Sequence, residues 1–353
     1  MRARSGAHAN HAEPNECGSR EALGGGNMFV PGSFAIALFM TALSAVFWGS
    51  WANTFKGTRG YRFELFYWDY AAGIVIVSFG LALTMGSMGS SGEGFIANLR
   101  AADASNLLYA LVAGFIFNIA NLLLVAGIDI AGLAIAFPIS IGIAVVEGVV
   151  LSYALQPKGS ALYLAAGVAL AIAAIICDAL AYNSLEAAGR KVSRKGIMVN
   201  VASGLLMGAF APFVTKAMTT GHALTPYSIT SLFSLGALLC CFLVNIYFMR
   251  HPLVGEPVDF SGFWSACGRN HAFGVAGGIV WGLGTSFNFV AASFVGVAVA
   301  YAIGQSAPMI AALWGVLAWK EFRGAGPKAW GYLALMFIFY LAAVTMIARA
   351  YQG

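Results

Sequence analysis

Ten long apolar segments constrain this sequence more than any other feature, because each has the length of a helix that crosses a membrane. A hydrocarbon core about 30 Å thick is spanned by a helix of roughly 20 residues. Only 9% of the 353 residues are charged and 60% are hydrophobic, whereas average domains carry about 25% charged residues. We therefore expect an all-α polytopic membrane protein with ten transmembrane helices, which excludes a soluble enzyme and a nucleic-acid-binding protein. The segments run over residues 33–55, 64–87, 105–127, 131–154, 161–183, 197–217, 224–249, 271–293, 296–319 and 328–350.

The N-terminal stretch, residues 1–27, differs in composition from everything that follows it. It mixes charged, polar and glycine residues and lacks the apolar core of a signal peptide. We interpret it as a disordered polar tail. The remaining chain divides into residues 28–195 and residues 196–353, and each part holds five of the predicted spans.

An internal repeat relates these two parts. A shift of 164 residues places Gly114 on Gly278 and Gly132 on Gly296, and it aligns two tight helical hairpins near these last glycines. Because five spans are an odd number, the second repeat enters the membrane from the opposite side. Such five-plus-five inverted repeats are typical of transporters that work by alternating access. Chance similarity between glycine-rich helices is the alternative.

The distribution of Lys and Arg predicts the orientation. The loops after the first, fifth, seventh and ninth spans lie on one side and carry twelve Lys and Arg residues, against four on the other side outside the tail. By the positive-inside rule, the richer side is cytoplasmic. We expect a multi-pass protein of the cytoplasmic (inner) membrane with both termini outside, although the three tail arginines oppose this orientation.

Three short motifs follow one another in the first two spans. They are Phe47-Trp48-Gly49-Ser50-Trp51, the stretch from Phe63 to Tyr70 (FELFYWDY), and Leu83-Thr84-Met85-Gly86. Together with the ten predicted helices, they resemble the drug/metabolite transporter superfamily, and within it the sugar and ureide branch. That branch includes the rhamnose–proton symporter, the glucose/ribose porters and the ureide permeases, and Trp68-Asp69-Tyr70 is similar to the Leu-Asp-Tyr of ureide permeases. The resemblance implies a transporter of small polar solutes and does not select one substrate.

Polar and tryptophan side chains inside the spans form the candidate substrate-binding set. Asn118 and Asn121 are three residues apart, so they share a helix face, and the 164-residue shift places Asn121 on Thr285. Equivalent faces of inverted repeats line one central cavity. Amides and indole rings suit a neutral, hydrogen-bonding solute, while hydrogen bonding between helices is the structural alternative. The full set is Trp48, Trp51, Asn118, Asn121, Trp281, Thr285, Asn288 and Gln305, the last after a Gly304 that loosens the helix.

Two carboxylates inside predicted spans are candidates for proton coupling. Glu147 is the deepest acidic residue, and Asp69 belongs to the motif that resembles the ureide permeases. Acidic residues within spans are costly and are often functional. A structural hydrogen bond or a position at a span end is the alternative. The histidines lie in the tail or at span ends, where we interpret them as solvated and keep a proton relay as the lesser alternative.

Other chemistries lack a sequence signature. The chain has no Gly-Lys-Ser/Thr phosphate loop, and its His, Cys and acidic residues show no metal-ligand spacing. We expect no enzyme activity, no cofactor and no metal site.

The resulting prediction is a secondary active transporter, coupled to protons, that moves a small neutral polar solute by alternating access. A sugar is the first choice of solute. A ureide or other nitrogenous solute is the alternative, and an exporter of drugs or metabolites is a further one. The lipid bilayer, the solute and the proton are the expected partners, nucleic acid is not, and a homodimer is left open.

Overall fold

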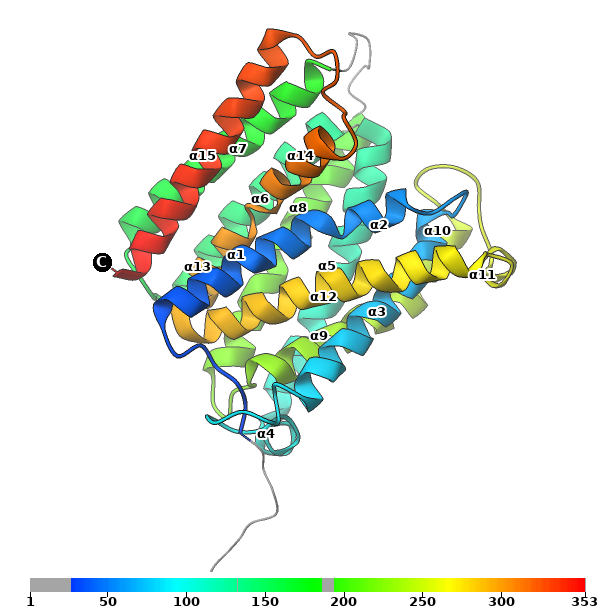
Figure 1. The fold of residues 1–353 in the computed structure, drawn as a ribbon. Helices are drawn as coiled ribbons and strands as arrows, with labels where there is room; N and C mark the ends of the chain where they lie inside the picture. Colours follow the sequence, from blue (N-terminus) through cyan, green and yellow to red (C-terminus); the bar gives the residue numbers. More distant parts are fainter. Residues whose placement is uncertain (1–26, 132, 186–193, 353) are drawn as a thin grey trace, which may run out of the picture.

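The computed structural model describes residues 27–131, 133–185 and 194–352, and its elements in these ranges are helices (Figure 1). Two isolated bridges, Asn27 with Gly89 and Met28 with Ser91, are the β pairing found there. Nine described helices are long and apolar enough to cross a membrane, and Ile139–Leu155 adds a shorter apolar helical stretch. These ten elements match the ten predicted segments, so the all-α polytopic fold is confirmed.

The spans follow one another along the chain with short connections. The first half contains α1 (Phe34–Ser50) with α2 (Ala52–Lys56), α3 (Phe63–Leu83), α5 (Ala104–Ala131), α6 (Leu133–Leu155) and α7 (Ala161–Asn183). The second half contains α8 (Arg194–Thr219), α9 (Pro226–Cys240) with a π-helical turn (Cys241–Asn245) and α10 (Ile246–Arg250), α12 (Gly268–Val295), α13 (Val297–Gly304) with α14 (Ala307–Leu317), and α15 (Pro327–Gln352). Two short helices, α4 (Phe95–Ala101) and α11 (Phe260–Trp264), lie in the connections that the sequence marks as polar.

The ninth span is a discontinuous helix. Gln305 and Ser306 separate α13 from α14, and their ψ angles of 2° depart from the α-helical value. Pro308 in the first turn of α14 has no backbone N–H to continue the ladder of α13. The break therefore lies directly after Gly304, where the sequence predicted a loosened helix.

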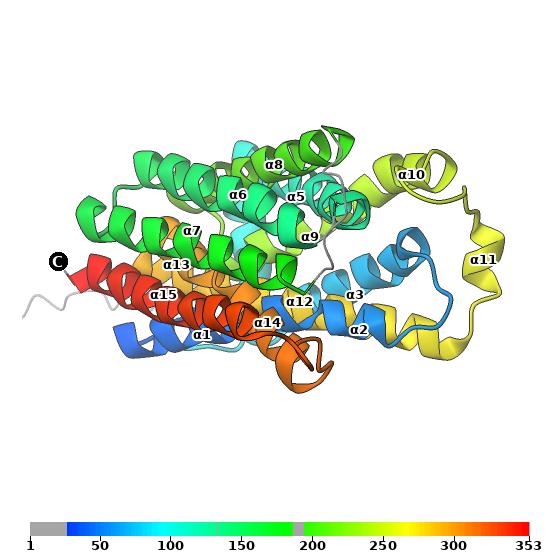
Figure 2. The ribbon, with the colours of Figure 1, turned by 90° about the horizontal axis from the view of Figure 1, so that it is seen from above.

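The loops gather at two ends of the bundle, which we call end A and end B (Figure 1, Figure 2). End A holds α4, the connection before α9 and both described termini, since the ring of Phe34 stacks on that of Tyr351 at 4.9 Å. End B holds α2, α10 and α11, and it carries the loops that are rich in Lys and Arg. The alternation of the ten spans between these ends agrees with the predicted topology.

The packing partners repeat between the two halves. Helix α5 packs against α8, and its repeat equivalent α12 packs against α1. Likewise α9 packs against α5, α3 packs against α12, and the equivalent helices α7 and α15 pack against each other. Each of these pairs takes helices from both halves, an interleaving that the predicted inverted repeat would produce.

Two equivalent glycines make these crossings close. A Cβ atom on Gly114 of α5 would lie 1.9 Å from the backbone oxygen of Phe233 on α9. A Cβ atom on Gly278 of α12 would lie 2.0 Å from the backbone oxygen of Tyr70 on α3. Small residues allow membrane helices to approach at such distances. The pairing of Gly114 with Gly278, predicted from the sequence shift, thus corresponds to the same contact in both repeats.

The predicted hairpin between the eighth and ninth spans is present. Helix α12 ends at Val295 and α13 begins at Val297, with Gly296 alone between them at φ 92°. This left-handed conformation favours glycine over residues with a side chain. The equivalent position in the first repeat, Gly132, lies outside the described residues.

Candidate functional site

Aromatic rings fill the centre of the bundle around Trp281 of α12. Phe117 of α5 stacks on Trp281 with ring centroids 4.5 Å apart and an interplanar angle of 26°. Trp48 of α1 and Phe233 of α9 lie nearly parallel to the same indole, with centroids 6.2 Å and 6.0 Å away. Because Phe117 and Trp281 are equivalent under the predicted shift, the stack lies where the two repeats meet.

Polar groups of the second repeat surround this cluster. The indole N–H of Trp48 donates a hydrogen bond of 3.0 Å to the hydroxyl of Thr285. The amide of Asn288 donates to the backbone oxygen of Ala300 at 2.9 Å. Gly304 packs between Trp48 and Asn288, since a Cβ there would lie 2.5 Å from the Trp48 ring and 2.9 Å from Asn288 Nδ2. The break in the ninth span therefore lies beside the cluster and brings Gln305 next to it.

The two asparagines of α5 contact different helices. The amide of Asn121 donates to the hydroxyl of Tyr67 on α3 at 3.0 Å. The amide nitrogen of Asn118 lies 3.6 Å from Cys241 Sγ, in the π-helical turn, and its buried oxygen has no hydrogen-bond partner within the described ranges. Both asparagines are buried. The two side chains reach α3 and the π-helical turn, which also contact each other, and this is compatible with one shared face of α5.

The structure brings most of the predicted binding residues around Trp281. Trp51 joins the group through Tyr70, whose ring lies 4.8 Å from Trp51 and 6.4 Å from Trp281. Tyr67, the partner of Asn121, also packs against Tyr70, with ring centroids 5.1 Å apart. In this conformation the polar side chains around Trp281 make their hydrogen bonds to other protein groups.

A cavity of about 340 Å³ opens at end B, beyond the Tyr67–Asn121 hydrogen bond. Aromatic side chains of Phe55, Tyr61 and Phe63 line one part of it, and Phe63 also contacts Tyr67 at 5.2 Å. Leu122 and Asp129 of α5 line the other part. We call this space the end-B cavity.

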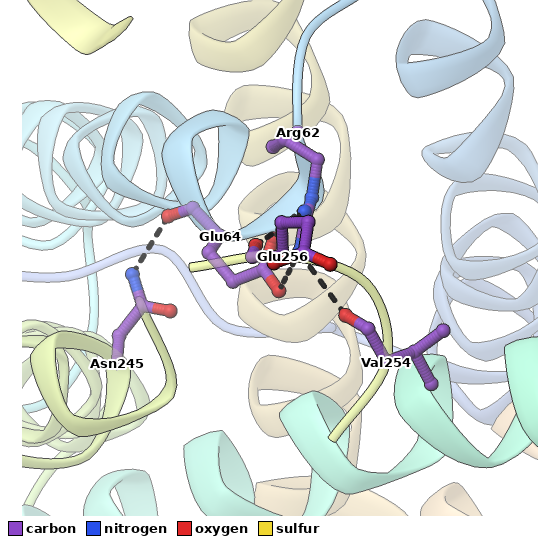
Figure 3. A network of polar contacts seen from close by, with 5 residues as sticks. All are labelled: Arg62, Glu64, Asn245, Val254 and Glu256. Carbon is purple, nitrogen blue, oxygen red and sulfur yellow. Dashed lines mark hydrogen bonds and ion pairs between the residues drawn. The ribbon is translucent and has the colours of Figure 1, made fainter. Parts of the chain in front are cut away.

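Arg62 holds the loop after α10 over this cavity (Figure 3). Its guanidinium binds both carboxylate oxygens of Glu64 at 2.8 Å and 3.2 Å. It also donates to the backbone oxygens of Glu256 at 2.7 Å and Val254 at 3.2 Å. The backbone oxygen of Glu64 accepts from Asn245, at 2.8 Å, so the π-helical turn joins the same network.

Glu147 of α6 lies away from the aromatic cluster. Its oxygen Oε2 is buried and has no hydrogen-bond partner among the residues that the structure describes. A Cβ on Gly208 of α8 would lie 2.9 Å from this oxygen. The next residue, Gly148, packs against the ring of Tyr301, whose hydroxyl donates to backbone oxygens of α6 and α8. Glu147 is thus half-buried between α6 and α8, and its role in proton coupling stays a prediction.

Asp69 lies near end B and has two partners. Its oxygen Oδ2 accepts a hydrogen bond from Tyr61 at 2.8 Å. The imidazole Nδ1 of His271 lies 3.0 Å from Oδ1 and 2.9 Å from Oδ2. The residue Asp69 is only 7% exposed. A Cβ on Gly274 would lie 2.4 Å from the Asp69 Cβ, so α12 closes over the carboxylate.

Sequence reasoning missed three residues that the fold assembles at end B. His271 was interpreted as a solvated histidine, and Arg62 was counted only as an orientation charge. Tyr61 attracted no attention. The sequence does place His271 and Asp69 close to the same end of two spans. It does not show that these two helices, α3 and α12, are neighbours.

Comparison with known proteins gives a consistent family. Residues 195–350 match the model of the ureide permease family. Ureide permease 1 of Arabidopsis thaliana is 24% identical over 381 residues, which cover 89% of this chain and 96% of that protein. Ureide permease 2 of the same plant is 23% identical, with the same coverage of both chains. These relatives are permeases, so the similarity indicates a membrane transporter rather than an enzyme.

One solved crystal structure supports the fold. It superposes with a TM-score of 0.63 at 16% identity and covers 88% of this chain and 97% of the other.

Proposed function

We propose that this chain, a relative of the ureide permeases, is a secondary transporter of a small neutral nitrogenous solute in the cytoplasmic membrane. The comparisons favour this alternative over a sugar, because the ureide permeases match over 89% of this chain. The observation that carries the proposal is the Phe117–Trp281 stack with amide and hydroxyl groups beside it. The placement in the drug/metabolite transporter superfamily is part of the same proposal.

The chemistry of the central cluster suits a ureide. A ureido group is planar, carries N–H donors and has a strong carbonyl acceptor. Its plane can stack on the face of an aromatic ring such as Trp281 once Phe117 moves aside, because the two rings are in direct contact in this conformation, with centroids 4.5 Å apart. Its donors and its acceptor match the side chains of Asn121, Thr285 and Tyr67, since amides and hydroxyls can both donate and accept.

Alternating access follows from the arrangement of the cavity and the cluster. The solute enters the end-B cavity and meets Phe63 and the Tyr67–Asn121 hydrogen bond. Breaking this bond frees the Asn121 amide and opens the way to Trp281. Closing end B and opening end A then releases the solute on the other side, with the two repeats exchanging roles. We place end B in the cytoplasm, because it carries the Lys- and Arg-rich loops.

Proton coupling belongs to the same proposal, with Glu147 and Asp69 as its carriers. The Asp69 carboxylate is buried, whereas Glu147 is half-buried with its oxygen Oε2 covered by protein. A carboxylate that alternates between a protonated and a charged state can tie a proton to the solute's passage.

Uptake into proteoliposomes tests the substrate. We expect labelled allantoin to accumulate, and glucose not to compete with it. Asn121→Ala and Thr285→Ala each remove a neutral hydrogen bond worth about 0.5–1.5 kcal/mol, so each should weaken apparent affinity about twofold to tenfold. Thr345→Ala is the matched control, because the Thr345 hydroxyl is exposed and bonds only to Leu341 of its own helix. Glucose uptake without allantoin uptake would overturn the proposal.

Glu147→Gln separates coupling from binding. Gln has almost the same shape as Glu and does not titrate, so accumulation driven by a pH gradient should be lost while exchange of labelled for unlabelled solute continues. Unchanged accumulation in this variant, with loss in Asp69→Asn, would assign the role to Asp69 alone. Persistence in both variants would contradict proton coupling through these two carboxylates.

A further inference from the structure

The three residues Tyr61, Asp69 and His271 connect water at end B with the end-B cavity. Asp69 is the buried member, with 9% of its side chain exposed, while 29% of the His271 side chain is exposed. Tyr61 lines the end-B cavity and donates its hydroxyl proton to Asp69. A continuous path of side chains thus runs from solvent through an imidazole to a carboxylate, and from there to the cavity.

The orientation of His271 is what a proton path requires. Its Nδ1 faces both oxygens of Asp69, and its Nε2 makes no hydrogen bond to a described residue. Phe263 of α11 and Tyr61 pack edge-on against the ring, with centroids 4.7 Å and 5.8 Å away, and hold its plane. Histidine is the side chain that most readily changes charge near neutral pH.

We propose that Asp69 and His271 form the site where this transporter exchanges its proton with water at end B. Through its hydrogen bond to Asp69, Tyr61 couples the protonation of this site to the end-B cavity. The inference rests on the proposed transport function and deepens it by assigning the proton path. It adds His271 and Tyr61, which the sequence did not select, and it gives Asp69 a role distinct from that of Glu147.

The proton moves in two balanced steps. A proton from water at end B binds Nε2 of the neutral imidazole, which becomes an imidazolium. The proton on Nδ1 then passes to Asp69, so the carboxylate becomes a carboxylic acid and the imidazole is neutral again. The site has gained one proton, and release runs through the same atoms in reverse.

Tyr61 links this proton to the solute. Burial, together with the hydrogen bond to Asp69, raises the pKa of Tyr61 well above its usual value, so its hydroxyl remains a donor. A hydrogen bond to a charged carboxylate is roughly twice as strong as one to a neutral group. Protonation of Asp69 therefore weakens its hydrogen bond with Tyr61, and the Tyr61 hydroxyl can then bind a solute in the end-B cavity.

The other polar and charged groups near Asp69 and His271 have partners elsewhere. Asn270, next to His271, bonds to the backbone of Arg59 on the loop before α3. Arg269 lies over the ring of Phe273 on α12 itself. Arg62 and Glu64 pair with each other, and from α11 the ring of Phe263 faces the imidazole. Arg250 and Asp259 line a separate cavity beside Leu65. His271 and Tyr61 are thus the groups that contact the carboxylate directly.

His271→Gln tests the proton path in proteoliposomes. We expect accumulation of allantoin driven by a pH gradient to fall at least tenfold, while exchange of labelled for unlabelled allantoin stays within twofold of wild type. Tyr61→Phe should keep transport and lower the number of protons moved per solute. His251→Gln is the matched control, because His251 also lies at end B, where it packs on Tyr247.

A second measurement does not depend on the solute. The infrared difference between acidic and alkaline samples should show a carboxylic-acid band that disappears in Asp69→Asn and whose pH midpoint moves in His271→Gln but not in His251→Gln. Loss of exchange together with accumulation in His271→Gln, or an unmoved band, would make the pair structural and overturn the inference. If wild-type protein moves no allantoin yet shows this band behaviour, the substrate proposal fails and the proton site stands.

Discussion

End A and end B of this protein are held together by different chemistry. At end A, neutral amides bridge the connections around α4 and before α9. Asn106 is fully buried, donates to the backbone oxygens of Thr220 at 2.7 Å and His222 at 3.0 Å, and accepts from the Thr220 hydroxyl. Asn98 joins the same segments through Ala223 and Thr225. These bonds are 2.7 to 3.0 Å long and part-buried, and they join neutral groups.

End B also has buried amides, Asn270 and Asn245, but adds charged groups that water reaches. Lys56 of α2 pairs with Glu321 at 2.6 Å, with 47% and 30% of their side chains exposed. Tyr182 of α7 donates to the other oxygen of Glu321 at 2.9 Å. Arg62, with 34% of its side chain exposed, clamps the loop over the end-B cavity. Exposed ion pairs contribute little because solvent and salt screen them.

This difference indicates which end opens first. Equivalent helices build both ends, yet the loops have different sequences, so the two-fold relation holds for the spans and fails for their connections. Contacts made by buried amides are costly to separate at either end, whereas the exposed ion pairs that end B adds separate easily. We infer that the described conformation is sealed at end A and ready to open at end B.

The largest expected effect comes from Asn106→Ala at end A. The substitution removes three hydrogen bonds of a fully buried side chain, each worth about 0.5–1.5 kcal/mol, while the His222 oxygen keeps the backbone N–H of Asp103 as a donor. We expect a clear loss of thermal stability in detergent, measured by unfolding with a fluorescence readout. Thr84→Ala is the control, since its exposed hydroxyl bonds only to its own helix. Equal stability of the two variants would remove the distinction between the ends.

A smaller effect is expected from Arg62→Met at end B. The variant keeps the apolar stem and loses the charge-assisted bonds to Glu64, Val254 and Glu256. Partial exposure reduces the cost to roughly 1 kcal/mol. Hydrogen exchange should rise in the loop of residues 251–259 and stay unchanged at end A. Arg323→Met, another end-B arginine, serves as the control, and faster exchange at both ends would contradict independent closure.

The smallest effect is expected from Lys56→Met. An exposed ion pair contributes about 0–1 kcal/mol, and a salt concentration of about 1 M screens it almost completely. The variant should therefore melt slightly below wild type in low salt and together with wild type in high salt. A difference that survives high salt would show that the contact of Lys56 with the ring of Trp319, 5.0 Å away, stabilises end B instead.

Much of the fold could be predicted from the sequence, for a physical reason. Lipid supplies no hydrogen-bond partners, so each span must satisfy its backbone as a helix, and hydrophobic length alone identifies it. The register of Gly114 with Gly278 predicted the repeat, because only small residues permit these close crossings. The break after Gly304 was predictable from the glycine and the nearby Pro308.

The candidate site was predictable only in part. Trp281, Thr285 and Trp48 were selected by type and spacing, and the structure brings them together. For Asn118 the sequence named no neighbour, since helix periodicity defines a face and not the helix opposite it, and the structure places Cys241 of the π-helical turn there. His271 was set aside because its partner, Asp69, lies 202 residues away in the chain.

Hydrophobic length by itself determined that this protein crosses the membrane with about ten helices, and glycine spacing predicted two related halves. The neighbours of each helix were decided only by tertiary packing, which sets α3 beside α12 and places Tyr61, Asp69 and His271 within hydrogen-bond distance. The reason is that the bilayer acts on each span separately, whereas polar partners inside the bundle depend on the rotation and crossing of whole helices. The sequence of a membrane protein therefore identifies its spans, whereas the polar partners inside the bundle are known only from the folded structure.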